Sequence, residues 1–254
     1  MRDVGPAEAT LDAFLGGRLT VAQPARGYRA GADAVLLAAA CPAAAGDSVL
    51  DLGCGAGVAS LCLGVRVGGL RQAGLELQAG YAALARANAL RNGLVLDVHE
   101  GDIARVPPPL CRSFDHVIAN PPWHAPGGTP SPLADRARAL QADRPLGDWV
   151  RAAARRLSPG GSLTLIASAA SLPGLLGALA PDLGAAMVLP LAARIGAPAG
   201  RILLRARKDA RAPLVLLAPF VLHHNEGDTE EARAILANGE SLCPRFAPGA
   251  VRAG

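Results

Sequence analysis

Between residues 48 and 167, short apolar runs typical of buried strands alternate with longer stretches of helical spacing. The predicted strands are Ser48–Leu52, Gln72–Glu76, Val95–Glu100, His116–Ala119 and Ser162–Ala167. The predicted helices are Val58–Val67, Gln78–Arg91 and Leu146–Leu157, the last closed by a stop and turn over Ser158–Gly161. Strands linked by crossover helices form parallel sheets covered on both faces, so the pattern predicts a doubly wound, Rossmann-like α/β fold.

The pattern is weaker on either side of this region. After residue 167 it indicates a helix over Leu172–Leu179 and strands over Arg201–Arg207 and Leu214–Leu222. Before residue 46 it predicts a helix over Ala32–Ala40, which we expect to cap the carboxyl edge of the sheet. From Pro244 the sequence is typical of a flexible tail. We therefore divide the chain into an N-terminal extension with a capping helix (1–45), a main domain (46–243) and a tail (244–254).

Composition narrows the class of protein. A chain of 254 residues that is 51% hydrophobic and 18% charged forms one compact domain, and a net charge of +4 permits a nucleic-acid partner without requiring one. The longest smooth apolar run, Ala34–Ala45, contains Pro42 and is far shorter than the roughly 20 residues of a membrane-spanning helix. Asp3, Glu8 and Asp12 interrupt the N-terminus where a signal peptide needs an apolar core. We expect a cytoplasmic protein without a membrane partner.

The cysteines and histidines predict no metal site. The five cysteines, which include no Cys-x-x-Cys pair, favour neither a disulfide framework nor a zinc cage. His223 and His224 are adjacent, so in a strand they would face opposite sides and would not readily bind one metal ion together.

A glycine-rich turn follows the first strong strand. Asp51 precedes Gly53, Cys54, Gly55 and Gly57, after which a helix is predicted. Alternating glycines let the backbone turn sharply and let a ligand approach the amides at a helix N-terminus. A dinucleotide site would place its third glycine one position later, so the spacing disfavours NAD. The Asp51 carboxylate beside the turn would attract a ligand with an amine or a positive charge, and S-adenosylmethionine carries both.

Two further strand ends carry acidic residues. Glu76 and Leu77 end the second strand, where a carboxylate can accept both ribose hydroxyls of an adenosyl group. Asp102 and Ile103 follow the third strand, where Asp102 can accept from an adenine amino group and Ile103 can pack on the ring. Each residue by itself fits a helix cap or a solvated turn, but their order after the glycine turn favours an S-adenosylmethionine site.

The fourth strand leads into Asn120, Pro121, Pro122 and Trp123. Consecutive prolines fix two φ angles and remove two amide donors, which leaves rigid backbone acceptors beside the Asn120 side chain. Acceptors aimed at one amino group can make its nitrogen more tetrahedral and stabilise the positive charge that develops during methyl transfer. Trp123 offers a face for a planar group taken out of its stack. Asn120 thus borders the cofactor as well as the substrate.

These residues resemble class I S-adenosylmethionine-dependent methyltransferases that methylate amino groups, and more closely the bacterial valine-tRNA adenine-37 N6-methyltransferase family. The resemblance rests on Phe14–Gly17, Gly27–Ala38, Asp51–Gly57, Asn120–Trp123, Ser158–Gly161 and Gly200–Gly227. In that family the Asn-Pro-Pro turn is followed by Tyr or Phe, whereas this chain has Trp123.

The resemblance implies a mostly parallel seven-stranded sheet with an antiparallel last strand, and a main domain that binds S-adenosylmethionine and releases S-adenosylhomocysteine without a metal. It also implies that Tyr28 and Arg29 fold over the site to bind substrate with Trp123, and that the substrate is tRNA. Arg201, Arg205 and Arg207 could form a phosphate-binding stripe or a charged strand edge, and the loop His124–Arg138 adds further arginines.

Other activities remain open from the sequence. A protein-glutamine or small-molecule N-methyltransferase would also use an Asn-Pro-Pro turn, and a chain that lost catalysis would be an S-adenosylmethionine- and RNA-binding module. The oligomeric state is not determined by these patterns.

Overall fold

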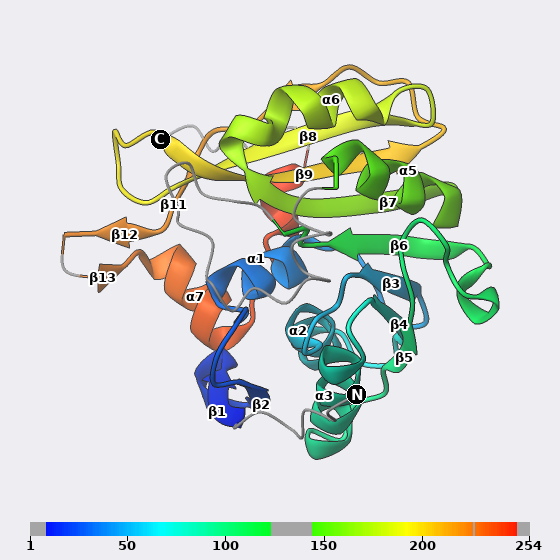
Figure 1. Cartoon of the computed structure of the whole chain (residues 1–254). Coiled ribbons are helices and arrows are strands. Elements are labelled where there is room, and N and C mark those ends of the chain that lie inside the picture. Colours follow the sequence, from blue (N-terminus) through cyan, green and yellow to red (C-terminus); the bar gives the residue numbers. More distant parts are fainter. Residues whose placement is uncertain (1–8, 123–143, 226, 248–254) are drawn as a thin grey trace.

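The computed structural model describes residues 9–122, 144–225 and 227–247 as one α/β domain with an N-terminal hairpin (Figure 1). The main strands of the sheet are β3 (Ser48–Leu52), β4 (Arg71–Glu76), β5 (Asp97–Glu100), β6 (Phe114–Ala119), β7 (Leu157–Ser168), β8 (Leu183–Ala192) and β9 (Ala199–Lys208). The described helices are α1 (Ala32–Ala40), α2 (Val58–Arg66), α3 (Ala79–Arg91), α5 (Leu146–Arg156), α6 (Leu172–Leu179) and α7 (Glu230–Asn238).

The strands lie in the order β5-β4-β3-β6-β7-β9-β8 (Figure 1). β9 runs antiparallel to both of its neighbours, whereas β3, β4, β5, β6 and β7 pair in parallel. The predicted mostly parallel sheet with an antiparallel seventh strand is therefore confirmed, but two short strands that pair with β8 bring the sheet to nine strands where seven were expected. The chain moves outward from β3 to β5 and then returns to β6 on the other side of β3, so β3 and β6 form the switch point of the doubly wound sheet.

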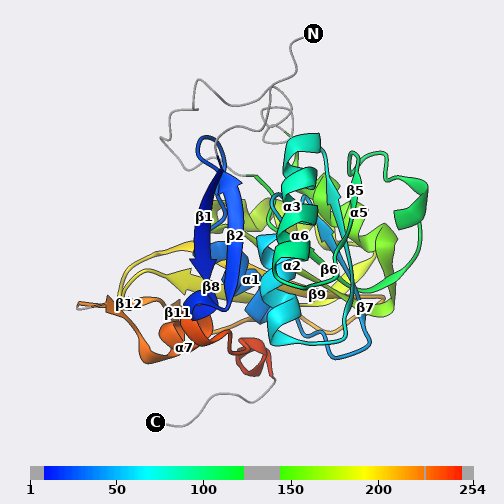
Figure 2. The same cartoon turned by 90° about the horizontal axis from the view of Figure 1, so that it is seen from below.

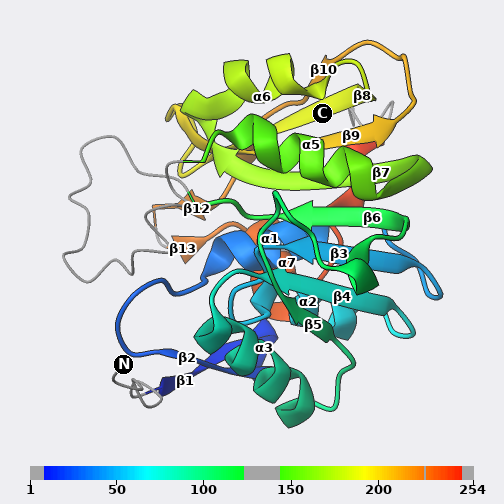
Figure 3. The ribbon, with the colours of Figure 1, turned by 45° about the vertical axis from the view of Figure 1, so that its right-hand side comes forward.

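Helices cover both faces of the sheet. On one face α1, α2 and α3 share an apolar core that includes Leu36, Leu61 and Ile118. On the other face α5 and α6 pack over Leu50, Val117 and Leu165 (Figure 3). The strands between these layers are apolar on both sides, as expected for a buried parallel sheet. Within the described residues, no helix is both long and apolar enough to cross a membrane.

An N-terminal hairpin was not predicted. β1 (Ala9–Phe14) and β2 (Leu19–Pro24) pair antiparallel and stand beside α3 (Figure 2). Asn88 of α3 is fully buried and bonds β2, because its Oδ1 accepts from Ala22 N at 2.8 Å and its Nδ2 donates to Ala22 O at 2.9 Å. Asn88 Nδ2 also donates to Ala56 O in the glycine turn at 3.0 Å, so one side chain joins the hairpin to that turn.

Four predictions for the outer elements need correction. Helix α1 does not cap the carboxyl edge of the sheet, because it lies against the face that α2 covers. Leu214–Leu222 is no continuous strand, since only β10 (Val215–Leu216) and β11 (Phe220–Val221) pair, both with β8. Residues from Pro244 do not begin a flexible tail, because η4 (Cys243–Phe246) forms a 3-10 turn with a buried Phe246. Ser158–Gly161 belongs to the start of β7.

Candidate active site

The predicted site residues gather where parallel strands end. Asp51 lies near the end of β3 and Asn120 directly follows β6, the neighbouring strand. Leu52 of β3 stands opposite Ala119 of β6 and Leu75 of β4, so three carboxyl ends lie at the same level. A switch point of this kind is where doubly wound sheets hold ligands.

The glycine turn has a conformation and a packing that require glycine. Gly53, Gly55 and Gly57 have φ angles of +70°, +56° and +86°, which is the left-handed region. A Cβ on Gly53 would lie 2.7 Å from Cη2 of Trp149, the buried aromatic of α5. The amides of residues 53 and 54 donate to Leu75 O at 2.7 and 3.1 Å, which fixes the turn on β4.

Two buried carboxyl groups lie below this turn. Asp51 is 2% exposed and accepts a 2.7 Å hydrogen bond from Ser60 Oγ, and burial raises its pKa to about 7. Glu76 is 4% exposed and accepts from Gly55 N and Gln78 N, each at 2.9 Å. Burial also raises the pKa of Glu76, although these backbone donors act against the shift. In the described chain neither carboxyl group forms an ion pair with a basic side chain.

The other predicted cofactor residues surround the turn. Asp102 already has partners, because it accepts from Arg144 Nη2 and from Ala104 N, each at 2.8 Å. Ile103 is buried in the core under α5, and Cys54 is buried beneath the turn, where burial raises the pKa of its thiol. Leu77 is half-buried after β4. Their roles toward a cofactor remain predictions.

Tyr28 comes close to Asn120 although 92 residues separate them in sequence. The Nδ2 of Asn120 donates to the phenol oxygen of Tyr28 at 3.1 Å. Tyr81 holds the backbone of Tyr28, since its hydroxyl accepts from Tyr28 N at 3.1 Å and donates to Tyr28 O at 3.0 Å. Pro121 is buried and Pro122 half-buried, while Trp123 lies outside the described residues, so its stacking role stays a prediction.

One small cavity of about 50 Å³ lies between the glycine turn and the Asn-Pro-Pro turn. Its lining residues are Tyr28, Gly53, Glu76, Gln78, Tyr81, Asn120, Pro122 and Trp149. This cavity is smaller than most ligand pockets, which usually measure roughly 300–1,000 Å³. Sequence reasoning missed Gln78, Tyr81 and Trp149. Gln78 could have been inferred from its place two residues after Glu76, but the helix faces that carry Tyr81 and Trp149 gave no comparable signal.

The arginines predicted to contact substrate have other partners here. Arg29 points to the hairpin, where its Nη2 bonds both carboxylate oxygens of Asp12 at 2.5 and 2.6 Å, and it is not part of the cavity lining. Arg201 pairs with Asp33, and the guanidinium of Arg205 lies over the ring of Phe246, 4.6 Å from its centroid. Arg207 is exposed and donates from Nε to Gly160 O at 3.3 Å. Since β9 lies between β7 and β8, the stripe is not a strand edge, and its role toward phosphate stays a prediction. The loop His124–Arg138 lies outside the described residues.

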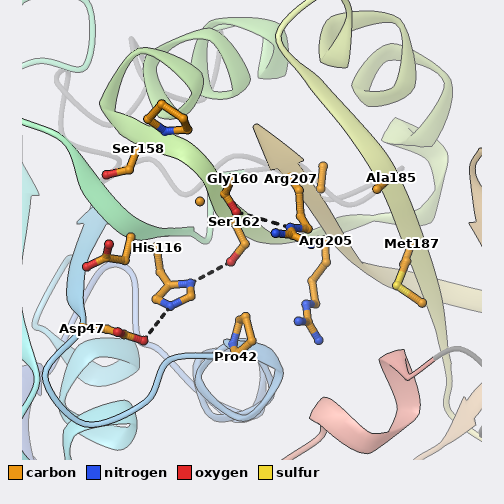
Figure 4. Close-up of a pocket in the computed structure, with 14 residues that line it drawn as sticks. Pro42, Asp47, His116, Ser158, Gly160, Ser162, Ala185, Met187, Arg205 and Arg207 are labelled. Atoms are coloured by element: carbon orange, nitrogen blue, oxygen red, sulfur yellow. Dashed lines mark hydrogen bonds and ion pairs between the residues drawn. The ribbon is translucent and has the colours of Figure 1, made fainter. Parts of the chain in front are cut away.

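A second, larger cavity of about 420 Å³ lies at the opposite, amino edge of the sheet (Figure 4). His116 bridges its wall, with Nδ1 2.8 Å from Ser162 Oγ and Nε2 3.0 Å from Asp47 Oδ2. Asp115 accepts from both the amide and the hydroxyl of Ser48, which lowers the pKa of its carboxyl group. The polar side chains of this cavity thus bond largely to one another. In the described part of the chain, no group of three His, Cys, Asp or Glu side chains could hold a metal ion.

The glycine turn, the acidic strand ends and the sheet order define the class I S-adenosylmethionine-dependent methyltransferase fold. Residues 30–176 match the family described as "Methyltransferase small domain", and the chain belongs to that family. A solved structure of a predicted O-methyltransferase from Agrobacterium tumefaciens matches with a TM-score of 0.68 and 26% identity, over 82% of this chain and 97% of that one.

Curated relatives include enzymes that act on RNA. The tRNA1(Val) (adenine(37)-N6)-methyltransferase of Klebsiella pneumoniae is 35% identical over 113 residues, which are 43% of this chain and 46% of that protein. The ribosomal RNA small subunit methyltransferase C of Chromohalobacter salexigens is 33% identical over 125 residues, 49% of this chain and 32% of that protein. The chain thus spans less than half the length of either relative.

Proposed function

We propose that the protein transfers a methyl group from S-adenosylmethionine to an exocyclic amino nitrogen, N6 of an adenine in tRNA. The observation that carries the proposal is that Gly53, Glu76 and Asn120 line one cavity at the switch point of the sheet. This arrangement brings the predicted cofactor turn and the predicted amine-binding Asn-Pro-Pro turn together.

The residues present suit the cofactor. At Gly55 a Cβ would meet only the Tyr28 ring, at 4.0 Å, so glycine there leaves space beside the cavity that Gly53 and Glu76 line. Glu76 would accept the ribose hydroxyls, and the carboxyl group of Asp51 would favour a positively charged ligand. When bound, S-adenosylmethionine supplies an electrophilic methyl group on a sulfonium centre.

Asn120 and the backbone of Pro121 act on the substrate. The lone pair of an exocyclic amine is delocalised into its ring, which makes the nitrogen a poor nucleophile. Accepting both N–H bonds, from the Asn120 carbonyl and the Pro121 carbonyl, directs the lone pair outward and stabilises the positive charge that forms on nitrogen. Holding the amine in line with the methyl group can lower the barrier by on the order of 7–11 kcal/mol. The transfer itself needs no strong base, because the positively charged methylated nitrogen then releases its extra proton to water.

RNA is the substrate class that the relatives favour. Both curated relatives described above are named for RNA methylation. The relative named for adenine N6 supports an adenine in tRNA, and the relative named for small-subunit ribosomal RNA supports testing that RNA in parallel. The same turn could also bind protein glutamines and small amines. The panel of test substrates therefore contains tRNA, small-subunit ribosomal RNA, a glutamine peptide and small amines.

The test is methyl transfer to total bacterial tRNA, followed by digestion to nucleosides and mass spectrometry for N6-methyladenosine. We expect wild-type protein to form this nucleoside and Asn120→Ala to lose at least about 100-fold in rate, as when one stabilising group of a transition state is removed. Cofactor binding, measured by calorimetry, is expected to stay within a few-fold.

A matched control is Asn238→Ala, because Asn238 is exposed at the end of α7 and lies outside the cavity lining. This variant should leave the methyl-transfer rate and the affinity for the cofactor unchanged. Product on ribosomal RNA or a glutamine peptide in place of tRNA would reassign the substrate. No transfer to any member of the panel, despite cofactor binding, would contradict the proposed function.

A further inference from the structure

The segment before α1 is fixed on both sides of Tyr28. Gln23 of β2, which is 2% exposed, receives Ala30 N on Oε1 at 2.8 Å and donates from Nε2 to Ala30 O at 3.0 Å. Asp12 of β1 holds the guanidinium of Arg29 and also accepts from Gln23 Nε2 at 2.7 Å. With the Tyr81 hydroxyl on the Tyr28 backbone, these bonds attach three consecutive residues to the hairpin and to α3.

These hydrogen bonds fix the backbone of Tyr28 and so place its side chain between the glycine turn and Asn120. The ring passes over the glycine turn, where its Cε1 lies 4.0 Å from the position of a Cβ on Gly55. Its phenol oxygen then reaches Asn120 Nδ2 at 3.1 Å. The hydroxyl of Tyr28 therefore meets the polar end of the side chain to which the proposed chemistry assigns the amine.

A carboxamide has two different ends, an NH2 that only donates and an oxygen that only accepts. The amine of a substrate needs the acceptor end. Because the Tyr28 oxygen takes the NH2 end of Asn120, the carbonyl oxygen is turned to the other side of the amide. If the Asn120 amide were rotated by 180° about its last side-chain bond, its NH2 group would face the N–H groups of the substrate amine, and two donors form no hydrogen bond.

From this geometry we propose that Tyr28 is a positioning residue: its phenol oxygen fixes the orientation of the Asn120 amide so that Oδ1 faces the substrate amine. The proposal rests on the proposed function, since it assumes that Asn120 receives an amino group. It assigns to the hydroxyl a role that differs from stacking of the ring on a base.

The first test compares Tyr28→Phe with Tyr28→Leu in single-turnover methylation with saturating cofactor. Phe keeps the ring but cannot accept the hydrogen bond, so we expect Tyr28→Phe to lower the transfer rate by about tenfold, the effect of one hydrogen bond. KM for RNA and the affinity for S-adenosylhomocysteine should stay within about twofold, because the ring and the cofactor turn are unchanged. Tyr28→Leu should weaken RNA binding as well.

The second test observes Asn120 directly by NMR of its 15N-labelled side-chain amide, assigned by its loss in Asn120→Asp. In Tyr28→Phe this signal should shift and its protons should exchange faster with water, both in the free protein and with S-adenosylhomocysteine bound. The side-chain amide of Asn88 is the internal reference, because it is fully buried and bonded to Ala22 and Ala56. It should not move.

Three results would overturn the inference. A Tyr28→Phe rate equal to or above wild type would show that the hydroxyl does not hold Asn120 productively. An Asn120 signal that is the same in wild type and Tyr28→Phe would show that the bond is absent in solution. Wild-type protein that binds cofactor but methylates no amine in the panel would remove the proposed function and the inference with it, which separates that failure from the first two.

Discussion

The two edges of the central sheet hold carboxyl groups in opposite electrostatic situations. At the carboxyl edge, burial raises the pKa of Asp51 to about 7 and also raises that of Glu76. At the amino edge, two hydrogen bonds from Ser48 lower the pKa of Asp115, whose side chain is 45% exposed. His116 at the same edge lies between Ser162 and Asp47.

This contrast indicates that the polar groups at the amino edge stabilise the fold, whereas those at the carboxyl edge suit a ligand. Carboxyl groups that are buried without a cation destabilise the folded chain when they ionise, and no ion pair among the described residues offsets this cost for Asp51 and Glu76. The amino-edge groups already have such partners within the protein, even though their cavity is the larger one. The two edges therefore differ in how far hydrogen bonds and ion pairs within the described residues balance their carboxyl groups, and this difference does not follow the size of the cavities.

The largest expected effect is the loss of stability when a glycine at each edge of the sheet is replaced by alanine. Gly53→Ala places a Cβ against the Trp149 ring in a left-handed backbone conformation, so we expect a loss of about 2–5 kcal/mol in unfolding free energy and no cofactor binding. Gly46→Ala, next to the amino edge, has a φ of +92° but open space, and should lose only about 1–2 kcal/mol. Urea denaturation measures both, and equal losses would contradict the close packing under the glycine turn.

The next effect is the pH dependence that Asp51 gives to stability. Its folded pKa of about 7 lies above the unfolded value of 3.8, so the folded state binds an extra proton between them and stability falls as pH rises through this window. Asp51→Asn removes this penalty, and its gain over wild type should grow from near zero at pH 4 to at most about 4 kcal/mol at pH 8. The measurement is urea denaturation without cofactor across this pH range. A gain that does not change with pH would mean that Asp51 is ionised in the fold.

The smallest expected effect is the pH dependence of stability due to Asp115 at the amino edge, and its sign is opposite to that due to Asp51. The lowered pKa of Asp115 contributes stability that is present above 3.8 and is lost as pH falls through its folded pKa. Asp115→Asn should therefore destabilise the protein by less than about 1 kcal/mol at pH 7, because the group is exposed, and by nothing in strong acid. Methyl transfer should not change. Thermal unfolding at several pH values tests this, and a larger loss at low pH than at pH 7 would reverse the comparison.

The sequence predicted the elements whose signals are local. The bounds of β3, α1 and α6 agree with the predicted ranges, because each is a compact apolar run next to strong turn or helix-start residues. Helix α7 also has local signals, since Thr229 caps it through Ala232 N and Gly239 ends it at a φ of +68°, yet the prediction omitted it.

Strand β8 and the hairpin were missed for a different reason. β8 contains Gly184 and Pro190, which disfavour strands, and it forms because β9 pairs along most of its length. The hairpin strand β1 is largely exposed and is held through β2 by Asn88 of α3 and by Asn92, which caps the end of that helix. Such long-range contacts outweigh local preference and leave no periodic signal.

The sequence by itself determined the backbone features of the site: the left-handed glycine turn, the acidic strand ends and the proline-fixed Asn120, because each depends on neighbouring residues and on strand direction. The resemblance already placed Tyr28 over the site. Only the tertiary structure decided that Tyr81 and Trp149 line the same cavity, that Arg29 turns to Asp12, and that Asp51 is buried. These outcomes depend on the packing of segments far apart in the chain, which sets burial and hence the free energy of every charge and hydrogen bond at the site.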